Sequence, residues 1–369
     1  MVWLYLFSGI LLLFVIITCL HSLLLPRPKK HSKVNGSPLV SILVPMRNEA
    51  HNVQGMVQAL KRQSYSSIEV FFLDDESTDG TTEALAVATL GDSRLNVVQG
   101  APKPDGWIGK VFACHQLSQH ATGDYLLFLD ADVRIEETAV SDVLALMQRK
   151  KLGLVSGFSR FLLPTFLNKL LVPLQHFIVL FHLPMVFARW SNWPPATAAH
   201  GGFMFFERGA YDSIGGHASV WSNIVEDVAI SKQIKKQGHK MWLLNITEFV
   251  SCTMYDSDRD VWTGFSKNIF NGLGRSVPLA LGISFFYGVF YVSPLFLASA
   301  AFIGDRPEWL IPYALISLQA FVVYLTTREP RHLAFFIPFS ALAFIALLLY
   351  AMTRSLKGHQ VEWKGRFYG

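Results

Sequence analysis

Residues 125–133 read YLLFLDADV, an apolar run suited to a buried strand that ends on two carboxylates, Asp130 and Asp132. An unpaired charge at the edge of a core is costly, so these carboxylates are expected to have a partner. In an extended chain residues i and i+2 share a face, so both are expected to point the same way. Together they suit Mg²⁺ or Mn²⁺, which takes one or two protein carboxylates plus phosphate oxygens and water. The alternative is that Asp132 caps a helix.

Apolar runs of the same kind recur along the chain and alternate with helical patterns. The runs are LVSILVP, IEVFFLDD, LNVVQG and DYLLFLDAD, and the helical patterns fall near 50–63, 80–89, 109–121 and 137–150. This alternation predicts an α/β domain with a mainly parallel, Rossmann-like sheet, which we place at residues 35–275. Ligands of such sheets bind at the carboxyl ends of the strands.

Polar residues follow the first two strands at that edge. Pro45, Arg47 and Glu49 come after the first strand, and Asp75 lies in the run DDESTDG after the second. One side chain is enough to cap a helix, so we assign Asp79 to capping and Asp75 to ligand binding. Neither a P-loop nor a GxGxxG sequence follows a strand, so a bound phosphate is expected to need a metal.

Apolar segments of membrane-spanning length flank this domain. Residues 1–26 predict a transmembrane anchor, and the basic residues after it place the following domain in the cytoplasm by the positive-inside rule. A cleaved signal peptide is the alternative, but the basic n-region and small-residue cleavage site are missing. We therefore expect a multi-pass protein of the cell membrane.

The C-terminal region, residues 277–353, holds apolar runs at 279–303, 309–327 and 333–353, followed by a basic tail at 354–369. Three full spans would put this tail on the side opposite the domain, which the positive-inside rule disfavours. The first run, interrupted by glycine and proline, is therefore expected to be re-entrant or interfacial. Residues 161–190 are apolar but punctuated by polar side chains, which predicts a helix lying in the interface.

The composition of the chain indicates which kinds of partner to expect. The chain is 51% hydrophobic with a formal net charge of +5, which fits a protein held against an anionic membrane. No basic stripe with interleaved aromatic residues is found in the polar part, so nucleic acid is not an expected partner. The three cysteines have no disulfide or metal spacing.

Six motifs in order resemble the family 2 glycosyltransferases with the GT-A fold: VSILVPMRNE, FFLDDESTDGT, GWIGKVFA, FLDADV, GGFMFFER and IVEDVAIS, within residues 40–231. The flanking spans and the tail VEWKGR resemble the membrane-bound subgroup that glycosylates carotenoids, hopanoids and other bacterial lipids. This resemblance implies an inverting, metal-dependent enzyme that moves a hexose, expected to be glucose from UDP-glucose, to a lipid such as a carotenoid acid. A polyprenyl phosphate or glycerolipid acceptor, and a non-catalytic membrane scaffold, are the alternatives.

The resemblance also implies roles for single residues of the donor site. Glu49 and Asp75 would contact the nucleoside, with Pro45 and Arg47 beside them, and Asp130 and Asp132 would hold Mn²⁺ or Mg²⁺ and the sugar diphosphate. Trp107 and Lys110 of the GWIGK loop would line the donor site. A lysine is unfavourable at the start of a helix, where the dipole opposes a cation, and this supports a functional role for Lys110.

The remaining roles concern the base and the acceptor. Asp227 corresponds to the general base of the family, with Glu226 in support, although acids in the first turn of a helix also have a structural explanation. Gly201 and Gly202, followed by Phe203, would let sugar or acceptor approach the backbone. The Gln-x-x-Arg-Trp motif of processive synthases is missing near residue 275. Positive charge near the diphosphate is therefore expected from Arg275 or, if the tail lies on the cytoplasmic side, from Lys364 and Arg366.

Overall fold

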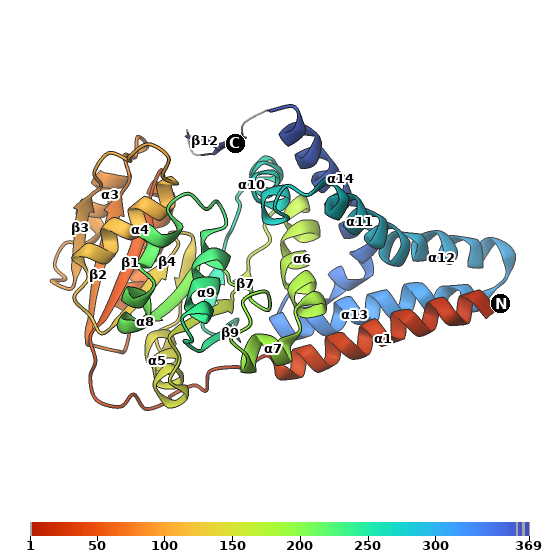
Figure 1. Cartoon of the computed structure of the whole chain (residues 1–369), viewed down its shortest axis with the longest axis horizontal. Coiled ribbons are helices and arrows are strands. Elements are labelled where there is room, and N and C mark those ends of the chain that lie inside the picture. Colours follow the sequence, from red (N-terminus) through yellow and green to blue (C-terminus); the bar gives the residue numbers. More distant parts are fainter. Residues whose placement is uncertain (1, 359–360, 364–365, 369) are drawn as a thin grey trace. The chain divides into compact units, whose positions relative to one another are not determined.

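The computed structural model describes residues 2–358 in full and the backbone of 361–363 and 366–368. The chain forms two compact units, each described by itself below, and Figure 1 labels many of their elements. The sheet unit comprises Leu25–Arg160 and Pro184–Thr253. The helical unit comprises Met1–Leu24, Phe161–Leu183 and Met254–Gly369. Lys364 lies outside the described residues, and the side chain of Arg366 does too.

A seven-stranded sheet forms the centre of the sheet unit, in the order β3-β2-β1-β4-β8-β6-β9. Its pairs are parallel except those of β8, which runs antiparallel to both β4 and β6. The strands are β1 (Val40–Met46), β2 (Ile68–Asp74), β3 (Leu95–Gln99), β4 (Tyr125–Leu129), β6 (Leu154–Phe158), β8 (Phe203–Glu207) and β9 (Met241–Asn245). β5 (Val133–Ile135) pairs antiparallel with β10 (Val250–Cys252), and β7 is Arg160–Phe161.

Helices connect these strands. They are α2 (Ala50–Lys61), α3 (Thr81–Ala88), α4 (Gly109–His120), α5 (Ala139–Lys150), α7 (Met185–Trp190), α8 (Arg208–Ser213), η1 (Gly216–Val220) and α9 (Glu226–Lys236). The central strands are apolar at nearly every position, as expected for strands covered on both faces. One core cluster joins Leu126 of β4, Val111 and Leu117 of α4, and Ile230 and Ile234 of α9. The starts of α4 and α9 are thereby fixed beside the end of β4.

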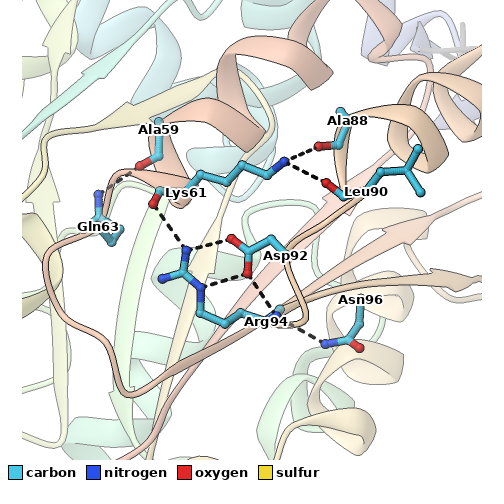
Figure 2. Close-up of polar contacts among 8 residues, drawn as sticks. All are labelled: Ala59, Lys61, Gln63, Ala88, Leu90, Asp92, Arg94 and Asn96. Atoms are coloured by element: carbon cyan, nitrogen blue, oxygen red, sulfur yellow. Dashed lines mark hydrogen bonds and ion pairs between the residues drawn. The ribbon is translucent and has the colours of Figure 1, made fainter.

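The β3 edge of the sheet is held by polar contacts, which Figure 2 shows. Lys61 at the end of α2 donates to two carbonyls at the carboxyl end of α3, those of Ala88 and Leu90, at 2.8 and 3.4 Å. Arg94 pairs with both oxygens of Asp92 at 3.0 and 2.7 Å, and it also donates to the Lys61 carbonyl at 3.3 Å. Helix α3 is therefore fixed at its carboxyl end, and its exposed side chains lie on a rigid element.

The helical unit is built from long apolar helices. Its elements are α1 (Val2–Leu24), α6 (Phe166–His182), α10 (Asp258–Gly272), α11 (Val277–Tyr287), the π-helix η2 (Gly288–Val292), α12 (Ser293–Gly304), η3 (Pro307–Leu310), α13 (Ile311–Thr327), η4 (Arg331–Phe336), α14 (Ile337–Leu356), β11 (Val361–Trp363) and β12 (Arg366–Tyr368). Four described helical stretches are long and apolar enough to cross a membrane: Val2–Leu24, Val277–Gly304, Pro307–Thr327 and Arg331–Leu356. They indicate that the chain associates with a membrane.

The first C-terminal run is helical throughout, although glycine and proline interrupt its sequence. Its irregularity is a π-helical turn at Gly288–Val292 that directly precedes Pro294. Proline lacks an N–H and clashes with the preceding turn, so a wider turn accommodates it without breaking the helix. Whether this stretch spans the membrane or is re-entrant stays a prediction, as does the interfacial position of residues 161–190.

A fully buried polar chain ties three elements of the helical unit together. Tyr291 donates to Gln319 Oε1 at 2.9 Å, and Gln319 Nε2 donates to Thr18 Oγ1 at 2.9 Å. All three side chains are at most 1% exposed. Among apolar helices a hydrogen-bonded chain of this kind stabilises one packing arrangement, because a shifted helix would leave its polar groups unpaired.

Candidate functional site

Asp130 and Asp132 lie in a tight turn between β4 and β5. The Val133 N–H donates to the Asp130 carbonyl at 3.1 Å, so the extended geometry from which we predicted a shared face is wrong. The turn still keeps the carboxylates near each other. Burial, the Asp130 charge and the Glu49 charge raise the pKa of Asp132 to about 7. The helix-capping alternative for Asp132 is not realised, since a strand follows it.

Lys110, in the first turn of α4, bridges two acidic segments that are far apart in sequence. Its Nζ lies 2.6 and 2.9 Å from the two oxygens of Asp130 and 3.2 Å from Glu226 Oε1. Burial lowers the pKa of Lys110, but these two carboxylates outweigh it and hold the pKa well above the ordinary value. The unfavourable position of a cation at a helix start is therefore compensated by Asp130 and Glu226.

Asp227 and Glu226 form the first turn of α9. Asp227 Oδ1 accepts from the N–H of Val228 at 2.7 Å. Burial and the adjacent Glu226 charge raise the pKa of Asp227 to about 7, while Lys110 and the Val228 N–H act in the opposite direction. A carboxyl group with a pKa in this range is suited to accept a proton near neutral pH.

The backbone of Gly201, just before β8, approaches this cluster closely. A Cβ added to Gly201 would lie 3.2 Å from Lys110 Nζ and 3.5 Å from both Asp227 Oδ2 and Glu226 Oε1. These residues share a pocket, whose lining is Pro45, Lys110, Cys114, Phe128, Leu129, Asp130, Gly201, Met204, His217, Glu226, Asp227 and Ile230. The structure thus brings together Pro45, Lys110, Asp130, Gly201, Glu226 and Asp227 from the predicted set.

Glu49 and Asp75 are both buried at the ends of the first two strands. Glu49, which is 9% exposed, accepts from Asn52 Nδ2 at 2.7 Å, and its N–H donates to Thr81 Oγ1 at 2.9 Å. Asp75, which is 4% exposed, receives a hydrogen bond from Arg47 at its backbone carbonyl. Contact of either side chain with a nucleoside stays a prediction.

Asp79 accepts hydrogen bonds at the starts of two helices. It accepts from the Thr81 N–H at 3.1 Å and, at the start of α2, from the Ala50 N–H at 3.0 Å. This agrees with the capping role that we assigned to it.

The GWIGK loop packs against the segment that leads to α9. Trp107 stacks near Phe112 and His115, with ring centroids 5.3 Å away in each case. The Ile108 N–H donates to the Trp221 carbonyl at 2.9 Å, and a Cβ on Gly106 would lie 2.7 Å from the Trp221 ring. This loop is therefore packed against the residues that lead to Glu226.

Of the predicted acceptor residues, Gly202 supports the turn and Phe203 lies in the core. The Gly202 carbonyl accepts from the Asp130 N–H at 3.3 Å, and the Phe203 side chain is fully buried. Arg275 belongs to the helical unit, where its Nε donates to Asn271 Oδ1 at 2.9 Å. The roles of these three residues, like those of Lys364 and Arg366, stay predictions.

Several residues of the site escaped the sequence reasoning. Cys114 and Ile230 line the pocket one helical turn after Lys110 and Glu226, and Met204 lies on β8, two residues after Gly202. These spacings of four and two would have found them. His217 has no comparable signal in the sequence, because it reaches the pocket only through the turn that contains η1. There its Nδ1 lies 2.8 Å from the Tyr211 hydroxyl.

Arg134 and Cys252 support Asp132 and were not predicted. Cys252 Sγ donates to Asp132 Oδ2 at 3.4 Å across the β5–β10 pair, a contact that only the folded sheet creates. Arg134 donates to Asn52 Oδ1 at 2.7 Å, and Asn52 in turn contacts Glu49.

Comparison with known proteins gives the following matches. The sequence model of glycosyl transferase family 2 matches residues 41–215. The 4,4'-diaponeurosporenoate glycosyltransferase of Staphylococcus haemolyticus (strain JCSC1435) is 24% identical over 338 residues, which is 89% of this chain and 88% of that protein. The enzyme of the same name from Staphylococcus aureus (strain MRSA252) is 24% identical over 342 residues, with the same shares of the two chains.

A solved structure supports the fold. The mannosyltransferase PcManGT from Pyrobaculum calidifontis, in complex with GDP-Man and Mn²⁺, aligns with a TM-score of 0.52 at 16% identity, covering 96% of this chain and 99% of its own. Together these findings confirm the predicted family resemblance, the predicted fold class and the prediction that the chain is an enzyme. The scaffold alternative is accordingly dropped.

Proposed function

We propose that this chain, a membrane-associated enzyme with a family 2 glycosyltransferase domain at residues 41–215, transfers a hexose from a nucleotide sugar to a membrane lipid with inversion. The expected donor is UDP-glucose, and the expected acceptor is a carotenoid acid or a related isoprenoid. The acceptor follows from the relatives named 4,4'-diaponeurosporenoate glycosyltransferase, which match along most of their length. A polyprenyl phosphate or a glycerolipid is the alternative acceptor.

The observation that carries this proposal is the meeting of Lys110, Asp130, Glu226 and Asp227 around Gly201 in one pocket. Single displacement needs a carboxylate on the acceptor side and positive charge on the side of the leaving diphosphate. Asp227 supplies the first and Lys110 the second. The missing Cβ of Gly201 lets the backbone approach both side chains closely, since a Cβ there would lie 3.2 Å from Lys110 Nζ and 3.5 Å from Asp227 Oδ2.

Asp227 acts as the general base in this proposal. With a pKa raised to about 7 it is partly ionised at neutral pH and able to take the proton of an acceptor hydroxyl. If the acceptor is a carboxylic acid, it is already ionised at this pH, and Asp227 then orients the acceptor instead of deprotonating it. Glu226 supports the site by holding Lys110.

A divalent cation fits the turn that holds Asp130 and Asp132. Asp132 Oδ1 is buried without a hydrogen-bond partner, which is costly and is remedied by a metal ligand bond. Within residues 2–358, His, Cys, Asp and Glu side chains form no complete metal-binding group, so the diphosphate and water would supply the other ligands. When bound, Mn²⁺ or Mg²⁺ neutralises charge on the leaving diphosphate. Lys110, which holds both oxygens of Asp130, would then turn toward the diphosphate.

We further propose that the enzyme is a multi-pass protein of the cell membrane with its sheet unit in the cytoplasm. Basic residues directly follow α1, and cytoplasmic loops carry an excess of lysine and arginine. A cytoplasmic site has access to the nucleotide sugar, while the apolar helices keep it close to a lipid acceptor.

The test is UDP release by detergent-solubilised protein given UDP-glucose and, separately, an apocarotenoid acid, a hopanoid, a diacylglycerol or a polyprenyl phosphate. We expect release with one acceptor class, lost in Asp227→Asn and kept in the matched control Asp212→Asn, which alters an exposed carboxylate on α8. Full activity of Asp227→Asn would refute the assignment of the base. UDP binding without turnover on every acceptor would refute the acceptor class and leave the donor site standing.

A further inference from the structure

Helix α7 and the loop after it present large apolar side chains to solvent. Met185 and Ala188 face the core of the sheet unit at 1% and 8% exposure. The opposite side carries Val186, Phe187, Trp190 and Trp193, which are 50%, 54%, 59% and 51% exposed. The rings of Phe187 and Trp193 pack against each other with centroids 5.9 Å apart, so the loop residue Trp193 extends the apolar surface of α7. We call these four side chains the aromatic face.

The sheet unit holds this segment firmly at both of its ends. Lys235 of α9 is 2% exposed, and its Nζ donates to the carbonyls of Ala188 and Ala196 at 2.9 and 2.7 Å. Trp242 of β9 donates from its ring N–H to the Arg189 carbonyl at 3.1 Å. The exposure of the aromatic face therefore belongs to an anchored element, and it does not arise from a loose loop.

The guanidinium of Arg189 reinforces the anchoring. It lies 4.7 Å from the ring centroids of both Trp190 and Trp242, so it links the aromatic face to β9 through two cation–π contacts. A segment that is fixed in this way and still leaves four large apolar side chains in water is a binding surface that needs a partner.

The chemistry of the segment selects the partner. Tryptophan is enriched where a protein meets the headgroup region, because its ring is apolar and its N–H is polar. Residues 184–199 contain one charged side chain, Arg189, and no carboxylate, which suits a surface of lipid phosphates. The segment begins directly after Leu183, the last residue of a stretch that belongs to the helical unit with its four apolar spans. A covalent neighbour of a membrane-associated stretch cannot lie far from the bilayer.

We infer that the aromatic face inserts into the headgroup region of the bilayer and seats the sheet unit on the membrane surface. This contact is separate from the spanning helices, since it belongs to the unit that carries the pocket. Its consequence for catalysis rests on the proposed function: five residues after Ala196 the chain reaches Gly201 at the pocket. A lipid acceptor would therefore meet the site along a segment that already contacts its bilayer.

The test compares two matched labels on the full chain in vesicles of phosphatidylcholine and phosphatidylglycerol. Val186→Cys places an environment-sensitive NBD label on the aromatic face. Val87→Cys places the same label on α3, where Val87 is 71% exposed at the opposite edge of the sheet. Both variants carry Cys19→Ser, and the other two cysteines are buried. Helix α3 is rigidly held (Figure 2), so differences in mobility do not confound the comparison.

We expect doxyl-labelled lipids to quench the label at 186 at least ~2-fold more than the label at 87. We also expect the label at 186 to be protected from quenching by aqueous iodide. Equal iodide access at both positions with no doxyl quenching would overturn the inference. Protection at 186 in detergent as well as in vesicles, without doxyl quenching, would also overturn it and assign the face to a protein contact. No readout depends on turnover, so failure of the proposed function would leave this result unaffected.

Discussion

Replacing Gly201 with alanine tests whether the pocket around this residue is the reaction centre. The new methyl group would lie 3.2 Å from Lys110 Nζ and 3.5 Å from Asp227 Oδ2 and Glu226 Oε1. The first distance is too short for comfortable packing, so the ammonium must move by a few tenths of an ångström. The ion pairs of Lys110 with Asp130, at 2.6 Å, and with Glu226, at 3.2 Å, would lengthen as a result.

The expected magnitude follows from this geometry. A misplacement of ~1 Å in an active site costs roughly 100-fold in rate, and the methyl group would press on both Lys110 and Asp227. We therefore expect kcat/KM to fall by about 10- to 100-fold, or roughly 1.4–2.7 kcal/mol of transition-state stabilisation. Stability should change little, because the contact falls on the mobile end of a lysine and Gly→Ala reduces the entropy of the unfolded chain by about 0.4–1 kcal/mol.

The assay measures kcat/KM for UDP release and the thermal midpoint of the same detergent-solubilised preparations. Gly209→Ala is the matched control, because Gly209 lies on α8, outside the pocket, and its added Cβ would lie at the same distance, 3.2 Å, from Glu207 Oε1. We expect this control to keep wild-type activity. If Gly201→Ala retained full activity with an unchanged midpoint, the space beside Lys110 would not be where the reaction takes place.

Four further predictions concern charge and packing. Burial and Glu226 raise the pKa of Asp227 to about 7, so with a hydroxyl acceptor, whose proton Asp227 must take, kcat/KM should rise with pH through that value. Lys110→Met removes a charge that lowers this pKa and should move the rise to higher pH. Because the pKa of Asp227 is higher in the folded than in the unfolded chain, its ionisation lowers the free energy of unfolding as pH rises from ~4 to 7. The free energy of unfolding of Asp227→Asn, measured by chemical denaturation, should lack this decrease. Lys235→Met removes the two hydrogen bonds that hold residues 188–196, so amide hydrogen exchange should become faster there. The matched control Lys232→Met, at an exposed lysine of the same helix, should leave this exchange unchanged. Gln319→Leu leaves the buried hydroxyls of Thr18 and Tyr291 without their partner and should lower the free energy of unfolding in detergent by about 1–3 kcal/mol. An unchanged unfolding midpoint would show that the Thr18–Tyr291 link is dispensable.

The strands and helices of the sheet unit could be predicted because their periodicity is strong and local. YLLFLDADV forms β4 followed by the acidic turn, and the acidic residues of the second motif follow β2, as their apolar runs indicate. The geometry at Asp130 could not be predicted, since the Val133-to-Asp130 hydrogen bond closes a turn that the alternation of residue types does not encode. Asp130 and Asp132 do lie near each other, but across a turn and not along an extended strand.

Contacts between distant segments were the other part that the sequence left open. The bridge from Lys110 to Glu226 joins residues more than a hundred positions apart, and it depends on α4 and α9 packing on the same core cluster. Cys252 reaches Asp132 only through the pairing of β10 with β5. The aromatic face also needed the structure, because the sequence shows tryptophans at 190 and 193 without showing which side of α7 is buried.

The reversed direction of β8 has a consequence for how such enzymes diversify. β6 ends at the same edge of the sheet as β4, and β8, running the other way, begins there. Residues 159–202 therefore leave and re-enter the seven-stranded sheet at the edge where the pocket lies, and no strand of that sheet lies within them. Evolution can lengthen, shorten or exchange this insert while the seven strands keep their order. The segment can therefore vary as a module, while the order of the strands that places Asp130 beside Lys110 stays unaltered.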